Sequence, residues 1–478
     1  MKAISIHPPR LEQVGNNARV SCVVDEAGEE KVVTFDVDSA WGEFLVTENV
    51  NAYLIALLPY AMRNSADIRL LAPVSADLLH SIEEFLVPHL AKYDDRLHPT
   101  KIHAEALQHG ALDNAGAVGT GMSMGVDSFF TVSKYLAPKY RDFKLTHPFV
   151  EQVGDLVEDR LSTRHKRNVN ERTIDEVADA LNLPVVYAYS NVRQLFRMRH
   201  YYTHTYTSMF FVHMLNKLFD TYFYSSTVDF GSFSLADSSR HDASHHELLS
   251  LQALSTRSLT LLSGGAASSR IEKTQALRDF QPARDYLRVC LFEEFNCMTC
   301  WKCRRTLLTM DMQDTLADFG KVMDVERYRE NREHYLAWLV KAFRESPDGV
   351  SIRELHTFFT QEHPEAMRRI EALYAEVRAA RFQPMKRPRR FTVAHDVRKV
   401  NPFEPEQLFG AGRAAGKTIE AGATIFFDEI VTVMGRKYLR TRRDSHLKAD
   451  LAIAMDALTE TRNTKGRARK SASAAVHG

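Results

Sequence analysis

The sequence lacks a long apolar segment, an apolar leader and a strong net charge. Its 478 residues include 62 Lys and Arg against 61 Asp and Glu, so the net charge of +1 gives no strong overall field toward nucleic acid or membrane. No stretch is long and apolar enough to span a bilayer. The first residues, MKAISIHPPRLEQ, lack the apolar core of a signal peptide. We therefore predict a cytoplasmic protein.

Cysteine is also scarce, and this argues against a disulfide framework. The chain has five cysteines, and four of them lie between residues 290 and 303 with the spacing Cys-x6-Cys-x2-Cys-x2-Cys. Four thiolates at such spacing can surround one metal ion as a tetrahedron. We predict a structural Zn²⁺ site. An iron–sulfur cluster is the alternative, but the ferredoxin run needs a further Cys followed by Pro, which is missing. The predicted ligands are Cys290, Cys297, Cys300 and Cys303.

Hydrophobic and charged residues, at 44% and 26%, are present in the proportions of an ordinary globular protein. Residues 18–26 and 31–38 have strand-like alternation, 51–64 has the pattern of a buried helix, and Ser75 is a candidate cap for the helix that follows it. Beyond residue 112, strand patterns alternate with helix patterns, which predicts an α/β fold with a parallel sheet. We expect four regions: an α+β domain at 1–111, an α/β domain at 112–312, a helical region at 313–382, and a basic extension at 383–478 whose end is disordered.

The segment GMSMGVDSFF, residues 121–130, has the composition of a phosphate-binding turn. Its small residues let a backbone approach a ligand, and the helix pattern that follows supplies backbone N–H groups and the positive end of a helix dipole. Asp127 suits the Mg²⁺ ion that accompanies a polyphosphate. A ligand-free helix cap explains the same residues, and the pattern alone does not decide between the two interpretations.

The run Ser123-Met124-Gly125-Val126-Asp127-Ser128 resembles the Ser-Gly-Gly-X-Asp-Ser signature of the PP-loop ATP pyrophosphatases. This resemblance implies a Rossmann-like ATP domain in which these six residues bind ATP and Mg²⁺. It also implies cleavage of ATP to AMP and pyrophosphate. The chain departs from the signature at Met124, where glycine is usual. Glycine takes a positive φ at little cost and methionine does not, so the conformation of residue 124 decides whether the loop is intact.

Together with the cysteine cluster, this motif is similar to that of the 7-cyano-7-deazaguanine synthases. Residues 268–280, SSRIEKTQALRDF, resemble the segment that precedes the metal ligands in that family, and the resemblance covers about residues 115–310. It implies Asp127, Ser128, Arg270 and Lys273 as catalytic residues. It also implies a ligase-type reaction in which a deazapurine-like carboxylate or an amide is adenylated. Ammonia, an amine or a peptide nitrogen then displaces AMP and forms a nitrile, an amide or a conjugate.

Two other functions fit the same sequence. One is tailoring of tRNA or nucleosides, with the basic extension holding nucleic acid. The other is a degenerate nucleotide-binding subunit, which the Met124 departure suggests. Relatives of the 7-cyano-7-deazaguanine synthases belong to nucleobase-modification, natural-product and antiviral defence pathways, and a homodimer is one candidate quaternary state.

Three further segments contain candidate binding residues. Asn191 follows a strand pattern and is either an adenosine contact or a plain turn residue. The polar loop 236–246 is either a substrate loop or a solvated surface. Residues 411–418 match a relaxed Walker A pattern, but the strand and helix that this motif requires are missing around them, so we reject it.

Overall fold

The computed structural model describes residues 3–152, 161–235, 242–290, 295–345 and 349–381. The predicted basic extension and the Walker-like segment lie outside these residues. The chain forms two compact units, Met1–Asn296 with Ala317–Val322, and Cys297–Leu316 with Met323–Gly478. No helix in the described ranges combines the length and the apolar character needed to cross a membrane.

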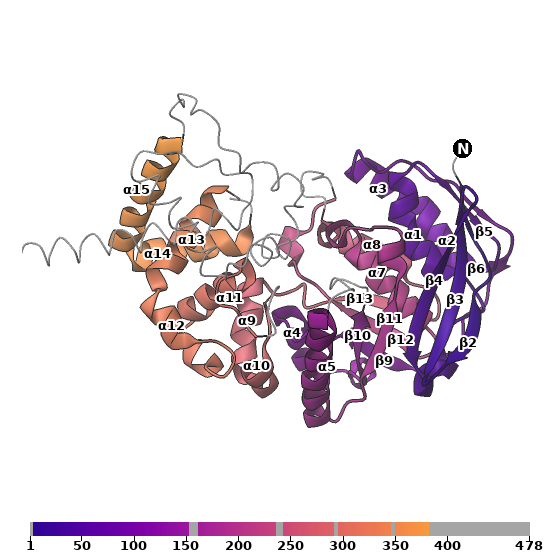
Figure 1. The fold of residues 1–478 in the computed structure, drawn as a ribbon, viewed down its shortest axis with the longest axis horizontal. Helices are drawn as coiled ribbons and strands as arrows, with labels where there is room; N and C mark the ends of the chain where they lie inside the picture. The colour runs from indigo at the N-terminus through magenta and orange to yellow at the C-terminus, as the bar shows by residue number, and fades with distance from the viewer. Residues whose placement is uncertain (1–2, 153–160, 236–241, 291–294, 346–348, 382–478) are drawn as a thin grey trace, which may run out of the picture. The chain divides into compact units, whose positions relative to one another are not determined.

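The first unit contains an eleven-stranded mixed sheet, counted over the described residues (Figure 1). Its strand order is β13-β12-β9-β10-β11-β4-β3-β1-β5-β7, and β2 pairs with β3. Most neighbouring strands are parallel, so the predicted α/β class is confirmed. The strands are β1 (Ala3–Ile6), β2 (Arg10–Val14), β3 (Asn17–Glu26), β4 (Glu29–Asp38), β5 (Asp67–Leu70), β7 (Ile102–Ala104), β9 (Ala117–Gly121), β10 (His147–Gln152), β11 (Val186–Ser190), β12 (Phe219–Ser225) and β13 (Thr260–Gly264); β6 (Val74–Ser75) and β8 (Leu107–Gln108) form a separate pair.

Five of these strands form a fully parallel group that determines where a ligand can bind. In chain order they are β9 to β13, and in space they follow the order 3-2-1-4-5. The chain leaves β9 on one side to form β10 and β11, and later returns to the other side to form β12 and β13. In open α/β sheets, ligands bind at the carboxyl ends of the strands beside such a switch point. The segment that follows β9 therefore occupies the position at which a ligand is expected.

The sheet continues without a break into the N-terminal part of the chain. β4 pairs antiparallel with β11, and β3 pairs antiparallel with β4 along its whole length. The division predicted near residue 112 therefore lies within one continuous sheet, and the division predicted near 313 lies within the second unit. The alternation predicted for 18–26 and 31–38 matches β3 and β4, whose inward side chains are buried.

Helices cover both faces of the parallel group. On one face, Tyr135 of α4 (Val126–Leu136) stacks on Phe223 of β12, with ring centroids 3.6 Å apart. The neighbouring strand residue Tyr222 points the opposite way and contacts Phe149, which in turn contacts Phe211 of α7 (His200–Met214). The predicted buried helix is α1 (Asn51–Arg63), which packs against α7. The other helices of this unit are α2 (Ala76–Ser81), α3 (Val87–Tyr93), α5 (Leu161–Leu181), α6 (Val192–Leu195), α8 (Glu247–Leu254), α9 (Arg270–Ala276) and α10 (Gln281–Tyr286). The unit also has 3-10 turns at Ser39–Phe44, Arg141–Phe143, Phe230–Ser232, Ala243–His246 and Leu277–Asp279, and a π turn at Ile82–Leu86. A further 3-10 turn, Leu316–Phe319, has its first residue in the second unit and the others in the first.

Ser75 occupies the N-cap position of α2 but does not cap it. Its side chain makes no bond to the first turn, and its Oγ instead accepts from Nδ2 of Asn51 at 2.7 Å. The predicted capping role is therefore wrong, because Asn51 on α1 competes successfully for the hydroxyl.

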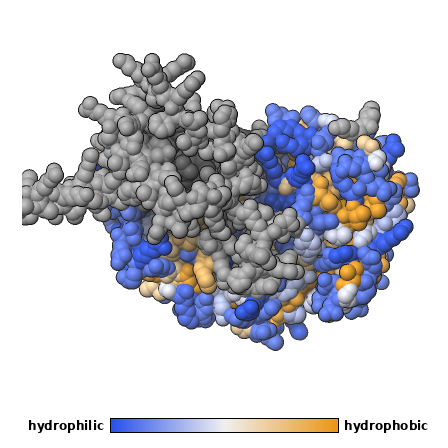
Figure 2. Space-filling view, viewed as in Figure 1, coloured by the Kyte–Doolittle hydropathy of each residue, from blue (hydrophilic) through white to orange (hydrophobic). Residues whose placement is uncertain are grey.

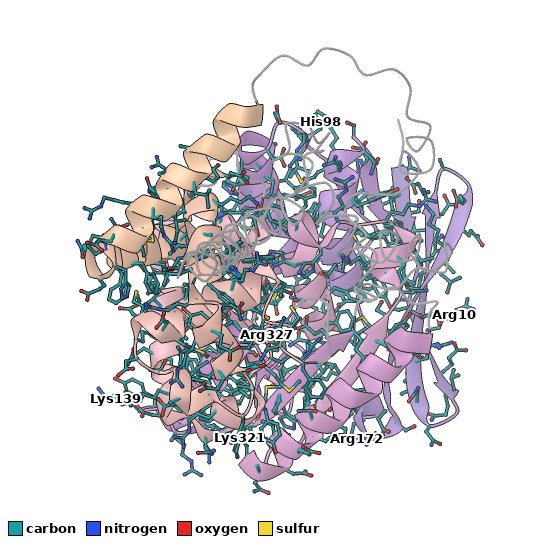
Figure 3. The ribbon with its side chains drawn as sticks, turned by 60° about the vertical axis from the view of Figure 1, so that its left-hand side comes forward. Arg10, His98, Lys139, Arg172, Lys321 and Arg327 are labelled. Atoms are coloured by element: carbon teal, nitrogen blue, oxygen red, sulfur yellow. The ribbon has the colours of Figure 1, made fainter. Side chains whose placement is uncertain are left out.

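The described part of the second unit is helical. It contains α11 (Trp301–Met312), α12 (Val325–Glu330), α13 (Arg332–Glu345), α14 (Val350–Glu362) and α15 (Pro364–Arg381). The carboxylate of Asp311 accepts from the hydroxyl of Tyr328 and from Nε of Arg332, both at 2.6 Å, and so joins α11, α12 and α13. Figure 2 shows that the visible described surface is mainly hydrophilic with scattered hydrophobic patches, and Figure 3 shows Arg10, Lys139 and Arg172 among the outward-pointing charged side chains.

Candidate functional site

The loop between β9 and α4 stands at the switch point of the parallel group. β9 ends at Gly121 and α4 begins at Val126, with Gly125 in the N-cap position. Ser128 is buried, and its hydroxyl donates to the carbonyl oxygen of Gly125 at 3.1 Å. The hydroxyl of Ser123 lies 3.2 Å from the same Ser128 oxygen. Ser128 thus holds the loop together from inside, and Val126 is buried beneath it.

Met124 has a left-handed backbone conformation, with a φ of +58°. This is the conformation that a glycine takes freely and that costs other residues roughly 1–2 kcal/mol. Its side chain is buried, and its carbonyl oxygen accepts from the backbone N–H of Arg288 at 2.9 Å. The loop therefore keeps the backbone shape of a glycine at this position although a methionine occupies it.

Gly125 differs from Met124, because it is a glycine in a backbone conformation that any residue can adopt. Its φ of −79° suits any residue, and a Cβ added there meets no atom closer than Oγ of Ser123 at 3.3 Å. The backbone conformation does not require glycine at 125, and an added Cβ would need only a small shift of the Ser123 hydroxyl. A glycine that the fold does not require leaves room for a ligand to approach the backbone at the start of a helix.

Two cations meet the carboxylate of Asp127 in the first turn of α4. Nη2 of Arg270 lies 2.5 Å from Oδ2, and Nζ of Lys273 lies 3.4 Å from Oδ1. Both cations come from α9, where a capping box of Ser269 and Glu272 fixes the first turn. Three of the four residues predicted to be catalytic are thus brought together. The fourth, Ser128, holds the loop beside them.

Lys273 is almost completely buried, with 1% of its side chain exposed. Its ammonium group also donates to the carbonyl oxygen of Ser226 at 2.7 Å, at the carboxyl end of β12. Burial lowers the pKa of Lys273, and the neighbouring Asp127 acts in the opposite direction. Such a buried cation, held between a carboxylate and a backbone carbonyl, is positioned to neutralise the charge of a bound anion.

Glu247, the first residue of α8, belongs to the same end of the sheet and was not predicted from the sequence. It is fully buried, and its Oε1 accepts from the hydroxyl of Ser263 at 2.8 Å. Its Oε2 makes no hydrogen bond. The nearby Ser226 hydroxyl acts to lower the pKa of Glu247. Burial raises the pKa of Glu247 to about 7. In the sequence, a glutamate in the first turn of a helix looks like an ordinary helix-dipole partner, so no local signal marked it.

Asn191 directly follows β11 and has a structural role. Its Oδ1 accepts from the backbone N–H of Thr34 at 2.8 Å, and its Nδ2 donates to the carbonyl oxygen of Val32 at 3.1 Å. Both partners belong to β4, so the amide extends the β11–β4 pairing. These two bonds fit the turn interpretation of Asn191, and its contact with adenosine stays a prediction. Of the predicted polar loop 236–246, only residues from Asp242 onward lie within the described ranges.

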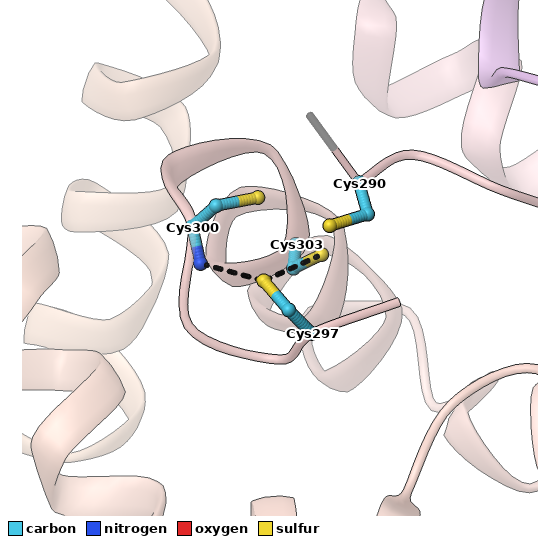
Figure 4. Close-up of side chains that lie close together, drawn as sticks. All are labelled: Cys290, Cys297, Cys300 and Cys303. Carbon is cyan, nitrogen blue, oxygen red and sulfur yellow. Dashed lines mark hydrogen bonds between the residues drawn. The ribbon is translucent and has the colours of Figure 1, made fainter. Parts of the chain in front are cut away.

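The four clustered cysteines lie close together, as Figure 4 shows. Their four sulfur atoms are all within 4.8 Å of one another, and Sγ of Cys297 is 4.0 Å from that of Cys303. A tetrahedron with metal–sulfur bonds of about 2.3 Å has sulfur–sulfur edges of about 3.8 Å. The backbone N–H of Cys300 also donates to Sγ of Cys297 at 3.3 Å, across a tight turn in which Met298 has a φ of +65°. The cluster can therefore bind a metal ion such as zinc. It is the one such group of His, Cys, Asp and Glu found among the described residues.

Comparisons of the chain with protein-family models, with curated proteins and with solved structures found no match. The function is therefore inferred from the residues and their geometry.

Proposed function

We propose that the loop at residues 121–128 binds ATP with Mg²⁺, and that the protein is an ATP-dependent enzyme similar to the 7-cyano-7-deazaguanine synthases. The main support for this proposal is that Arg270 and Lys273 both pair with Asp127 at the start of α4. This cluster lies after the first strand of a 3-2-1-4-5 parallel group, where α/β sheets bind ligands. The glycine-like backbone of Met124 supports an intact loop over a degenerate one.

Each part of the site has a distinct task in this proposal. Backbone N–H groups of the loop and the positive end of the α4 dipole face the phosphates. Arg270 and Lys273 neutralise phosphate charge, and they release part of their hold on Asp127 as they do so. The freed Asp127 carboxylate is an oxygen ligand of the kind that Mg²⁺ prefers, and the ion would supply further neutralisation of phosphate charge.

The proposed reaction has two steps. A carboxylate oxygen of the substrate attacks the α-phosphorus, the bond to the β-phosphate oxygen breaks, and pyrophosphate leaves with the electron pair. A nitrogen nucleophile then attacks the adenylated carbonyl carbon, and AMP leaves. The protein contributes mainly positioning and charge neutralisation. The resemblance favours a deazapurine-like carboxylate as substrate; a protein or peptide amine as nitrogen donor remains an alternative, as does tRNA tailoring.

We further infer that the metal of the cysteine cluster is zinc and that its role is structural. Four thiolates complete a tetrahedron and leave no open position for a substrate. Cys300 occupies the N-cap of α11 and Cys303 lies in its first turn, so a bound ion would fix the start of that helix.

Release of AMP and pyrophosphate from ATP tests the proposed function. The wild-type protein should catalyse exchange of labelled pyrophosphate into ATP when given the carboxylate that corresponds to the nitrile of 7-cyano-7-deazaguanine. Binding of MgATP without exchange, across a panel of carboxylates, would instead favour the nucleotide-binding subunit. Salt-dependent RNA binding that is lost on deletion of residues 383–478 would favour the tRNA alternative.

A further inference from the structure

A hydrogen-bonded chain of three side chains lies at the carboxyl end of β12, in addition to the cluster around Asp127. The hydroxyl oxygen of Tyr224 is 2.6 Å from Nδ1 of His204, and Nε2 of His204 is 2.9 Å from Oδ1 of Asp242. The three residues come from β12, from α7 and from the N-cap of the turn Ala243–His246. This is the arrangement of a proton donor, a base and a carboxylate that orients the base.

The direction of proton transfer follows from the state of Asp242. Burial acts to raise the pKa of Asp242, but the hydrogen bond and charge interaction with His204, and hydrogen bonds from Ser244, lower it to about 2, so the carboxylate is ionised and only accepts. The proton between the two residues therefore sits on Nε2 of His204. When the imidazole is neutral with its proton on Nε2, Nδ1 is the acceptor for the hydroxyl of Tyr224. Thr205 contributes a longer contact, its hydroxyl lying 3.5 Å from the same Nδ1.

The Tyr224–His204–Asp242 group lies on the ligand-facing edge of the sheet. The preceding residue Phe223 pairs with Thr120, and Tyr224 pairs with Ser263, whose hydroxyl binds Glu247. Since Phe223 pairs with the next-to-last residue of β9, Tyr224 is level with the end of β9, from which the 121–128 loop departs. Tyr224 therefore lies at the same edge of the sheet as the 121–128 loop, with its side chain on the face that α7 covers.

Burial and charged neighbours keep the phenol of Tyr224 neutral. Burial and the nearby Glu247 raise the pKa of Tyr224 well above its ordinary value, which excludes a stable tyrosinate at neutral pH. Glu151 of β10 acts on it in the same direction. His246 is held neutral by burial, with its pKa lowered to about 3, and the ring of His200 packs 5.3 Å from that of His204. A neutral tyrosine can still pass a proton on if it receives one as it gives one up.

We propose that Tyr224 and His204 remove the proton from the attacking nitrogen in the second step, with Asp242 positioning His204. As the nitrogen–carbon bond forms and the carbon–oxygen bond to AMP breaks, AMP leaves with the electron pair of that bond. The nitrogen gives its proton to the oxygen of Tyr224, while the Tyr224 hydroxyl proton moves to Nδ1 of His204. The imidazolium that forms is paired with the Asp242 carboxylate. This inference rests on the proposed function for the identity of the step.

The first experiment separates the two steps of the reaction in Tyr224→Phe, His204→Gln and the exposed control Tyr140→Phe. Pyrophosphate exchange should stay within about threefold of wild type in all three proteins. Transfer of the deazapurine carboxylate to ammonia should fall by about 10²–10⁴-fold in the first two and stay unchanged in the control. Transfer that equals wild type in Tyr224→Phe and His204→Gln overturns the relay. Absence of exchange in the wild type counts against the proposed function itself.

The second experiment needs no substrate. Nitrogen NMR of the histidine side chains, with His204 assigned by its loss in His204→Gln, reports which ring nitrogen carries the proton. The relay requires Nε2–H and an unprotonated Nδ1 at neutral pH, and it requires the Nδ1 signal to shift in Tyr224→Phe. A His204 that carries its proton on Nδ1, or whose Nδ1 signal does not respond to loss of the Tyr224 hydroxyl, overturns the relay whatever reaction the protein catalyses.

Discussion

Arg270 Nη2 lies 2.5 Å from Oδ2 of Asp127, a residue 143 positions earlier in the chain. Both side chains are about 85% buried, so the pair is a charge-assisted bond largely shielded from solvent. Together with Lys273 it places two cations and one carboxylate at the start of α4.

Asp127→Asn should lower ATP turnover by about 10²-fold or more while the protein stays folded. The amide keeps a hydrogen-bonding oxygen for Arg270 but loses the charge that Mg²⁺ requires. Release of AMP is the measurement, and circular dichroism checks the fold. The exposed Asp142→Asn is the matched control and should keep wild-type turnover. Near-normal AMP release by Asp127→Asn would remove this residue from the site.

Met124→Gly should be more stable than Met124→Ala by about 1 kcal/mol, because glycine relieves the left-handed backbone strain that alanine retains. Both variants lose the same buried side chain, so the difference isolates the backbone. Urea denaturation measures the two free energies of unfolding.

Met122 supplies the control for this comparison, since it is equally buried but has no positive φ. There the order should reverse, with Met122→Ala the more stable by about 0.5–1 kcal/mol. The same order at both positions would contradict the strained conformation of Met124.

Purified protein should contain one zinc ion per chain, and Cys303→Ala should lose it together with stability, since metal binding contributes to the folding free energy. Metal analysis by mass spectrometry is the measurement. Cys22→Ala removes a buried cysteine outside the cluster and should retain full zinc content. A brown protein with iron and labile sulfide would show that the site binds an iron–sulfur cluster instead.

The free energy of unfolding should fall as the pH rises, because Glu247 loses its proton. Because burial raises its folded pKa from 4.5 to about 7, the unfolded chain loses this proton first. Stability is therefore lost between about pH 4.5 and 7, by on the order of 3 kcal/mol in total. Glu247→Gln should abolish this dependence, so that its stability relative to wild type rises between pH 5 and 8 in urea denaturation.

The exposed Glu29→Gln serves as the control, with 75% of the Glu29 side chain in solvent. It should change stability equally at both pH values. A constant difference for Glu247→Gln as well would show that Glu247 has an ordinary pKa.

The strands that the sequence predicted best are those with one buried face. Val20, Cys22 and Val24 alternate with partly exposed residues in β3, and this period of two is visible in the letters. The pattern gave no signal for β13 or for β2. β13 is the short run TLLSG, which ends in Gly264 and is followed by Gly265, and all five residues of β2 are exposed. Without burial on one face, pairing with β3 alone makes β2 a strand, and pairing is not written in local composition.

The residues of the candidate sites also differ in how well the sequence predicts them. The loop and the cysteines were predictable because their residues are adjacent in sequence. The capture of the Asn191 amide by β4 depends on a partner 157 positions away. Likewise, Tyr224, His204 and Asp242 meet only after β12, α7 and the turn at 243–246 are assembled. No spacing rule connects such residues, so the sequence could not reveal them.

The central claim is that the 121–128 loop binds MgATP, and calorimetric titration tests it most directly. The wild-type protein should bind MgATP at one saturable site. Gly125→Val should fold, since its φ suits valine and the Ser123 hydroxyl 3.3 Å from the new Cβ need shift only slightly, but it should lose binding because the added side chain keeps phosphate away from the loop backbone. No heat of binding with the wild-type protein, or equal binding by Gly125→Val, would contradict the account.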